Sequence, residues 1–111
     1  MRDARGVPFM ATAWSGWTYG LRIPPPDRDK HFSPPWSTVV LDLEGGPVTT
    51  VHVSASFWRH CPELRSSVTG DWIAGQAFIP WSHGGAPSFT MEPAGGDRFI
   101  VHRAQWSSAQ G

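Results

Sequence analysis

The sequence predicts a mainly β protein, a small half-open antiparallel β-barrel with one or two short helices within residues 54–75. Two observations carry this prediction. Short segments in which apolar and polar residues alternate recur along the chain, which is typical of half-buried strands. The 111 residues include 12 Gly and 11 Pro, which indicates many turns and few long helices. A chain of this length forms one domain around one core.

The first predicted strand is WTYGLRI, residues 17–23, in which Tyr19, Leu21 and Ile23 alternate with smaller or polar residues. The three prolines at 24–26 end it, because proline donates no hydrogen bond to a strand ladder. The charged stretch DRDKH, residues 27–31, follows at once. We expect this stretch to form an exposed loop.

The next two segments predict an antiparallel hairpin. WSTVVLDL, residues 36–43, and VTTVHVS, residues 48–54, both alternate, and the EGGP between them carries the residues that a reversal needs. At the end of the chain, SFTMEP and RFIVHR flank the glycine loop AGGD and predict a second hairpin. The sequence thus predicts about five strands in all.

The middle of the chain lacks a period of two, and here we expect the helices. Pro62 suits the first turn of a helix, Glu63 follows it favourably, and Cys61 would be its cap. A second short helical turn is predicted at Thr69–Gly75.

The predicted core consists of the inward positions of the strands, with Trp58 or Trp72 closing one end of the barrel. The eight core positions are Leu21, Ile23, Val39, Leu41, Val51, Val53, Phe99 and Val101. We expect residues 14–103 to form the barrel domain, with residues 1–13 as an N-terminal extension and residues 104–111 as a flexible tail. Met10 is a second candidate start.

Composition excludes some classes of function. Nine Lys plus Arg balance nine Asp plus Glu, so bulk charge does not hold this chain to nucleic acid or to a membrane. Cys61 is the single cysteine and permits no intrachain disulfide, which fits a reducing cytoplasm. No apolar run approaches the ~20 residues that cross a bilayer, so we expect a cytoplasmic protein without membrane contact.

No motif indicates catalysis or a metal. Cys61 at a helix start would favour a thiolate, but the adjacent His60 forms no dyad with it by sequence proximity alone. The usual zinc spacings are missing, as are a nucleophile elbow and a phosphate loop. Asp27, Asp29 and His31 would share one face of an extended loop and could hold a metal, although a solvated loop is the simpler account. We therefore expect no catalytic residue, metal or cofactor.

The charged stretch admits two interpretations. In one, it is a solvated loop with internal charge pairs that prevents aggregation at a neighbouring edge strand. In the other, it is an arm that presents Arg22, Arg28, Lys30 and His31 to phosphates or base edges, while two aspartates orient the arginines. As exposed groups, Arg28 and Lys30 would contribute little to stability in either case.

The motif GLRIP at residues 20–24, followed by charge and by HF, resembles the DNA-binding pseudobarrel family. That family includes plant transcription-factor domains and effector domains of restriction endonucleases. SFWRHC and GDWI are loosely similar to its aromatic-rich segment. The resemblance implies an open barrel with two arms that grip the DNA major groove. Arg22, Arg28, Lys30 and His31 would lie on the first arm, and Thr49, Thr50 and His52 on the second, which differs from the family in having no Arg or Lys.

These observations order three hypotheses. The first is a non-catalytic module that recognises nucleic acid, DNA in particular, as the specificity part of a larger assembly. The second is a protein-interaction module with an exposed patch of tryptophan and arginine. The third is a small enzyme built on Cys61 and a histidine. DNA or a protein is the expected partner, and the oligomeric state is left open.

Overall fold

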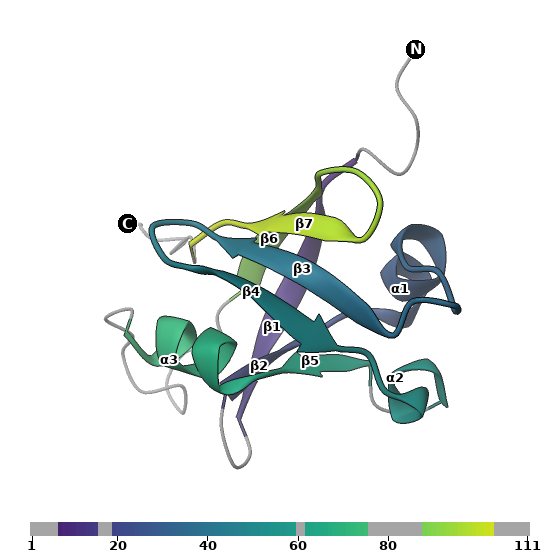
Figure 1. Cartoon of the computed structure of the whole chain (residues 1–111), viewed down its shortest axis with the longest axis horizontal. Coiled ribbons are helices and arrows are strands. Elements are labelled where there is room, and N and C mark those ends of the chain that lie inside the picture. Colours follow the sequence, from purple (N-terminus) through teal and green to yellow (C-terminus); the bar gives the residue numbers. More distant parts are fainter. Residues whose placement is uncertain (1–6, 16–18, 60–61, 76–87, 104–111) are drawn as a thin grey trace.

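The computed structural model describes residues 7–15, 19–59, 62–75 and 88–103 (Figure 1). Seven strands and three short helices follow one another along these ranges. In chain order they are β1 (Phe9–Ser15), β2 (Tyr19–Arg22), α1 (Pro25–His31), β3 (Thr38–Leu43), β4 (Val48–His52), α2 (Ala55–Arg59), β5 (Glu63–Arg65), α3 (Ser67–Ala74), β6 (Ser88–Pro93) and β7 (Arg98–Val101).

All seven strands belong to one sheet in the order β4-β3-β7-β6-β1-β2-β5. The sheet curls until its two end strands, β4 and β5, lie side by side, so the barrel is nearly closed (Figure 1). The predicted small, half-open β-barrel is therefore confirmed. Neighbouring strands are antiparallel except β3 and β7, which pair in parallel with Leu41 opposite Phe99.

Both predicted hairpins form. β3 and β4 pair with Val39 opposite Val51, and β6 and β7 pair with Met91 opposite Val101. Positive φ angles explain glycine in both connections: 72° at Gly45 in the first, and 102° and 57° in the Gly95-Gly96 loop of the second. Other residues adopt this left-handed backbone only with strain.

The helices differ in part from expectation. α2 and α3 both fall within residues 54–75, as predicted, and Ser66 caps α3 by accepting a 3.1 Å bond from the Thr69 amide. The helix expected after Pro62 is wrong, because residues 63–65 form β5. Its central Leu64 lies opposite Leu21 on β2, and both are fully buried. The burial of Leu64 in the core therefore favours a strand over a helix at these residues. None of the described helices is long and apolar enough to span a bilayer.

The charged stretch is a helix and not a loop. α1 starts at Pro25, where the fixed φ of proline and its missing N–H suit the first turn. Asp27 lies in the first turn and Arg28, Lys30 and His31 lie in the last, which complements the helix dipole. The expectation of a loop, and of helix only within residues 54–75, was therefore wrong.

The barrel also begins earlier in the chain than expected. β1 spans Phe9–Ser15 and lies between β2 and β6, with Ala11 opposite Phe89. Residues 9–13 thus belong to the sheet and not to an extension, because Phe9, Ala11 and Ala13 are buried in the core. The expected tail at residues 104–111 lies beyond the ranges that the structure describes.

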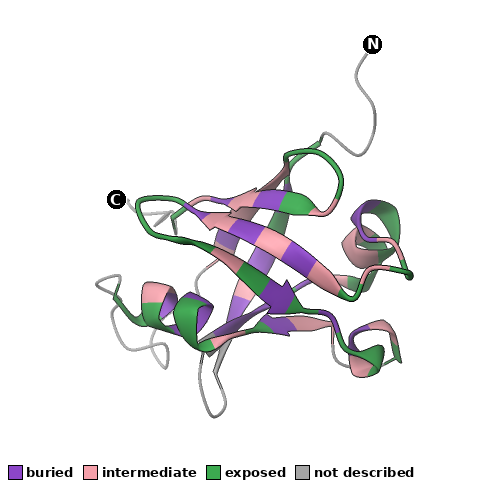
Figure 2. Ribbon diagram, viewed as in Figure 1, coloured by how far each residue is buried: buried purple, intermediate pink, exposed green. Residues whose placement is uncertain are grey.

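Side chains that point into the barrel form the core, and their polar or exposed neighbours face out (Figure 2). All eight predicted core residues are buried, at most 7% exposed. An aromatic cluster fills the side of the barrel near α1 and α2, where Phe32 stacks on Phe99 with ring centres 4.7 Å apart. On the side near α3, Trp72 packs against Phe89 at 5.5 Å. Trp58 and Trp72 are both partly buried against the core.

Candidate functional site

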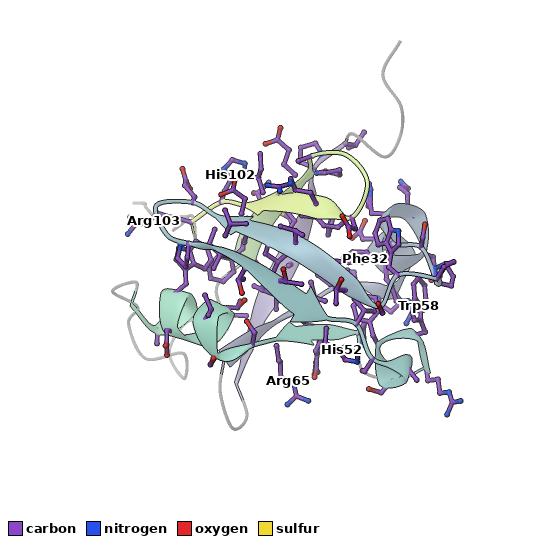
Figure 3. The ribbon with its side chains drawn as sticks, viewed as in Figure 1. Phe32, His52, Trp58, Arg65, His102 and Arg103 are labelled. Carbon is purple, nitrogen blue, oxygen red and sulfur yellow. The ribbon has the colours of Figure 1, made fainter. Side chains whose placement is uncertain are left out.

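A hollow of about 250 Å³ lies at the seam between β4 and β5. Its described lining is polar and comes from both strands and from α2 with the residue before it: His52, Ser54, Ser56, Glu63 and Arg65. His52 and Arg65 are labelled beside each other in Figure 3. We call this hollow and its lining the seam site.

Strand alternation positions these side chains. Val51 on β4 and Leu64 on β5 point into the core at 1% and 0% exposure. Their neighbours, His52 on one strand and Glu63 and Arg65 on the other, therefore point outward. The two strands are the ends of the sheet order, so no ladder of backbone hydrogen bonds joins them in the part of the chain that the structure describes. The incomplete closure leaves room for the hollow.

An ion pair joins the seam site to β2. Arg22 lies opposite Glu63 in the register and donates to its Oε2 from Nη2 at 2.6 Å and from Nε at 3.2 Å. The Glu63 side chain is only 6% exposed, whereas that of Arg22 is 53% exposed. The arginine therefore compensates the recessed carboxylate and keeps most of its own surface in solvent.

Arg65 lies across β2 at Gly20. A Cβ atom at Gly20 would approach the Arg65 Cγ to 2.5 Å and the Leu64 carbonyl oxygen to 3.0 Å. Because Gly20 has no side chain, the stem of Arg65 can pass over this position. Glycine here thus has a local role in placing a cation of the seam site.

Of the residues predicted from the sequence, one lines the seam site and a second pairs with a residue of its lining. His52 lines the hollow, and Arg22 reaches it through Glu63. Thr50 is exposed on the same outward face of β4, while Thr49 points toward the barrel interior and is half-buried. Glu63 and Arg65 were missed. The alternation of Glu-Leu-Arg about a buried leucine was the signal that could have found them.

The predicted site residues of α1 have three different surroundings. Arg28 is 13% exposed; it donates from Nη1 to the Phe57 carbonyl oxygen at 3.1 Å, and its guanidinium lies 5.4 Å from the ring centre of Trp58. His31 is 6% exposed and stacks on Phe9 with ring centres 4.5 Å apart. Lys30 remains exposed. Arg28 therefore joins α1 to α2, and His31 belongs to the barrel interior.

The structure offers no metal site in the charged stretch. Asp27, Asp29 and His31 would share a face only in an extended loop, but they lie on a helix, and His31 is buried. No cluster of three His, Cys, Asp or Glu side chains able to hold a metal occurs among the described residues. Cys61 and His60 fall outside those residues.

The described tryptophans do not form an exposed patch. Trp36, Trp58 and Trp72 pack against the core. The side chains of the other four of the seven tryptophans are not among those described. The protein-interaction hypothesis thus finds no anchor in the described tryptophans.

A second polar cluster joins the β3–β4 turn to β6 and to the end of β7. Nε2 of His102 lies 2.9 Å from Oε1 of Glu92, and the Arg103 amide donates to Oε1 of Glu44 at 2.6 Å. His102 and Arg103 appear away from His52 and Arg65 in Figure 3. These bonds tie neighbouring segments of the barrel together.

No protein-family model matches this chain, and neither the curated proteins nor the solved structures give a significant match.

Proposed function

We propose that this protein is a non-catalytic nucleic-acid recognition module, with DNA as its ligand, and that it supplies specificity within a larger assembly. One observation carries the proposal: Arg65, His52 and two serines line a polar hollow at the seam, and Arg22 forms an ion pair with Glu63 of the same lining. Guanidinium groups bind phosphate through several N–H donors at once, and hydroxyls add further contacts to the backbone.

The register gives the two arginines a useful spacing. Arg22 lies opposite Glu63, and Arg65 lies two residues further along β5. As diagonal neighbours on antiparallel strands, their Cα atoms are roughly 7–8 Å apart. The two guanidinium groups can thus contact the same phosphate or successive phosphates of one strand. Glu63 holds Arg22 by two of its five N–H donors and leaves the others for a ligand.

The small number of cations fixes the expected salt dependence. Two to three phosphate contacts give a slope of about −2 to −3 in a plot of log K against log salt for a duplex. Removal of one contact should lower the slope by about 1. A protein partner bound through apolar contacts would show almost no slope.

The test is fluorescence anisotropy of a labelled short duplex, and of its single strand, across a range of salt concentrations. Arg65→Ala should weaken binding and flatten the slope, and Arg65→Lys should restore part of both. The matched control is Arg103→Ala, which removes the same charge at the β3–β4 turn, away from the seam site. Equal loss in the two alanine variants, or no binding by the parent protein at low salt, would refute the proposal.

A further inference from the structure

The seam site contains a hydrogen-bond acceptor as well as donors. Both bonds from Arg22 go to Oε2 of Glu63, and the described residues supply no further partner for this carboxylate. A carboxylate has about four lone-pair sites. Polar groups as recessed as this one, at 6% exposure, are as a rule well supplied with hydrogen bonds. The hollow therefore suits a ligand that brings an N–H donor to Glu63.

Donors surround this acceptor. Arg65 follows Glu63 by two residues on the same face of β5, and Ser54 and Ser56, whose hydroxyls lie 2.9 Å apart, also line the hollow. A ligand that matches these groups carries an amino group, which donates to Glu63. Next to it the ligand carries an unprotonated atom, which accepts a hydrogen bond from the surrounding donors. Cytosine offers this edge, with its N4 amino group next to N3 and O2, and glutamate is a known acceptor for cytosine N4. Adenine has a similar pair, whereas thymine has no exocyclic amino group.

The recessed position of Glu63 indicates an unpaired base. At 6% exposure, its carboxylate can be reached only by a group that enters the hollow. In a duplex the Watson–Crick edge is already hydrogen-bonded, while in a single strand or at an unpaired end it is open. A hollow of about 250 Å³ is smaller than a typical pocket for a drug-sized ligand, which suits one small ring.

We infer that the seam site reads an unpaired base carrying an exocyclic amino group, cytosine fitting best, through Glu63, while Arg65 and Arg22 hold the flanking backbone. This inference rests on the proposed function and adds strandedness and base preference to it. It names Glu63 as the specificity-determining residue.

The test compares labelled dC10, dA10 and dT10 by fluorescence anisotropy at one low salt concentration. The parent protein should bind dC10 about 10-fold more tightly than dT10, with dA10 between them, since one good base contact discriminates about 5- to 150-fold. Annealing dC10 to dG10 should remove the advantage. These measurements need no variant, so they decide the question even if a substitution harms folding.

The variant Glu63→Gln then tests whether Glu63 causes the preference for dC10 over dT10. The amide keeps a carbonyl oxygen for Arg22 but replaces a negative acceptor by a neutral one, so the dC10 to dT10 ratio should fall to about 2 or less while binding of dT10 is kept. Glu92→Gln, in the second polar cluster, is the matched control and should keep the parent ratio. Equal binding of all three oligonucleotides would overturn the inference and leave the proposed function standing. Absence of binding to any nucleic acid would overturn both.

Discussion

Replacing Arg28 by alanine should destabilise the protein, because its side chain joins two helices. The bond from its charged Nη1 to the half-buried Phe57 carbonyl, 3.1 Å long, is worth ~1.5–3 kcal/mol. The guanidinium over Trp58 adds ~0.5–1 kcal/mol. The pair with Asp29 adds close to nothing, since that carboxylate is 63% exposed. The sum predicts a loss of ~2–4 kcal/mol in the free energy of unfolding.

The assay is urea unfolding followed by tryptophan fluorescence and by circular dichroism. Lys30→Ala, on the exposed side of α1, is the matched control and should stay within ~0.5 kcal/mol of the parent. Arg28→Lys should be intermediate, because a lysine cannot both reach the carbonyl and lie flat over the indole. If Arg28→Ala were as stable as Lys30→Ala, the side chain would not join the helices, and its expected role at a phosphate would return. While it remains folded, Arg28→Ala should keep its nucleic-acid affinity.

Two further predictions concern the barrel and the seam site. Trp72→Ala should cost ~3–5 kcal/mol of unfolding free energy in the same urea assay, because it removes a large ring packed on Phe89 and a bond to the β3–β4 turn; a change below ~1 kcal/mol would mean that this ring does not belong to the core. Gly20→Ala should lower the free energy of unfolding by ~1–3 kcal/mol, because its Cβ would meet the Arg65 Cγ at 2.5 Å and the Leu64 carbonyl at 3.0 Å. The same change should weaken oligonucleotide binding, because it displaces Arg65. Unchanged affinity would show that the position of Arg65 over Gly20 does not matter for binding.

The strands and their inward faces could be predicted because alternation is a local signal. Val39 and Leu41 on β3 are two residues apart, as are Val51 on β4 and Val53 directly after it, and all four are buried. The order of the strands is a different matter. β3 pairs in parallel with β7, which lies more than fifty residues later, so no turn between neighbours could indicate it. Long-range pairing of this kind is decided by which hydrophobic faces fit together in the closed barrel.

The two errors in helix placement have opposite causes. In α1, the prolines suggested an interruption, although proline is well tolerated in a first helical turn, and the acid-then-base order of Asp27 and Lys30 was a usable helix signal. In β5, the signal at Pro62 was a genuine helix-start pattern, but Leu64 buries its side chain opposite Leu21 only if the chain is extended. Local propensity was sufficient in the first case and was overridden by tertiary contacts in the second.

Under the proposed function, the seam site is where a chain of zero net charge would contact an anionic polymer. Outside the seam site, two acids have local partners: Asp29 pairs with Arg28, and Glu92 contacts His102. At the seam, Arg22 pairs with the recessed carboxylate of Glu63, and Arg65 lines the hollow two residues further along β5, so two cations lie close together although the whole chain has no net charge. Such a site does not attract a ligand by long-range electrostatics, because at physiological salt its charges are screened beyond a Debye length of ~8 Å. The proposed affinity would therefore have to come from close contacts in the hollow, and selection among bases would require the same close contacts.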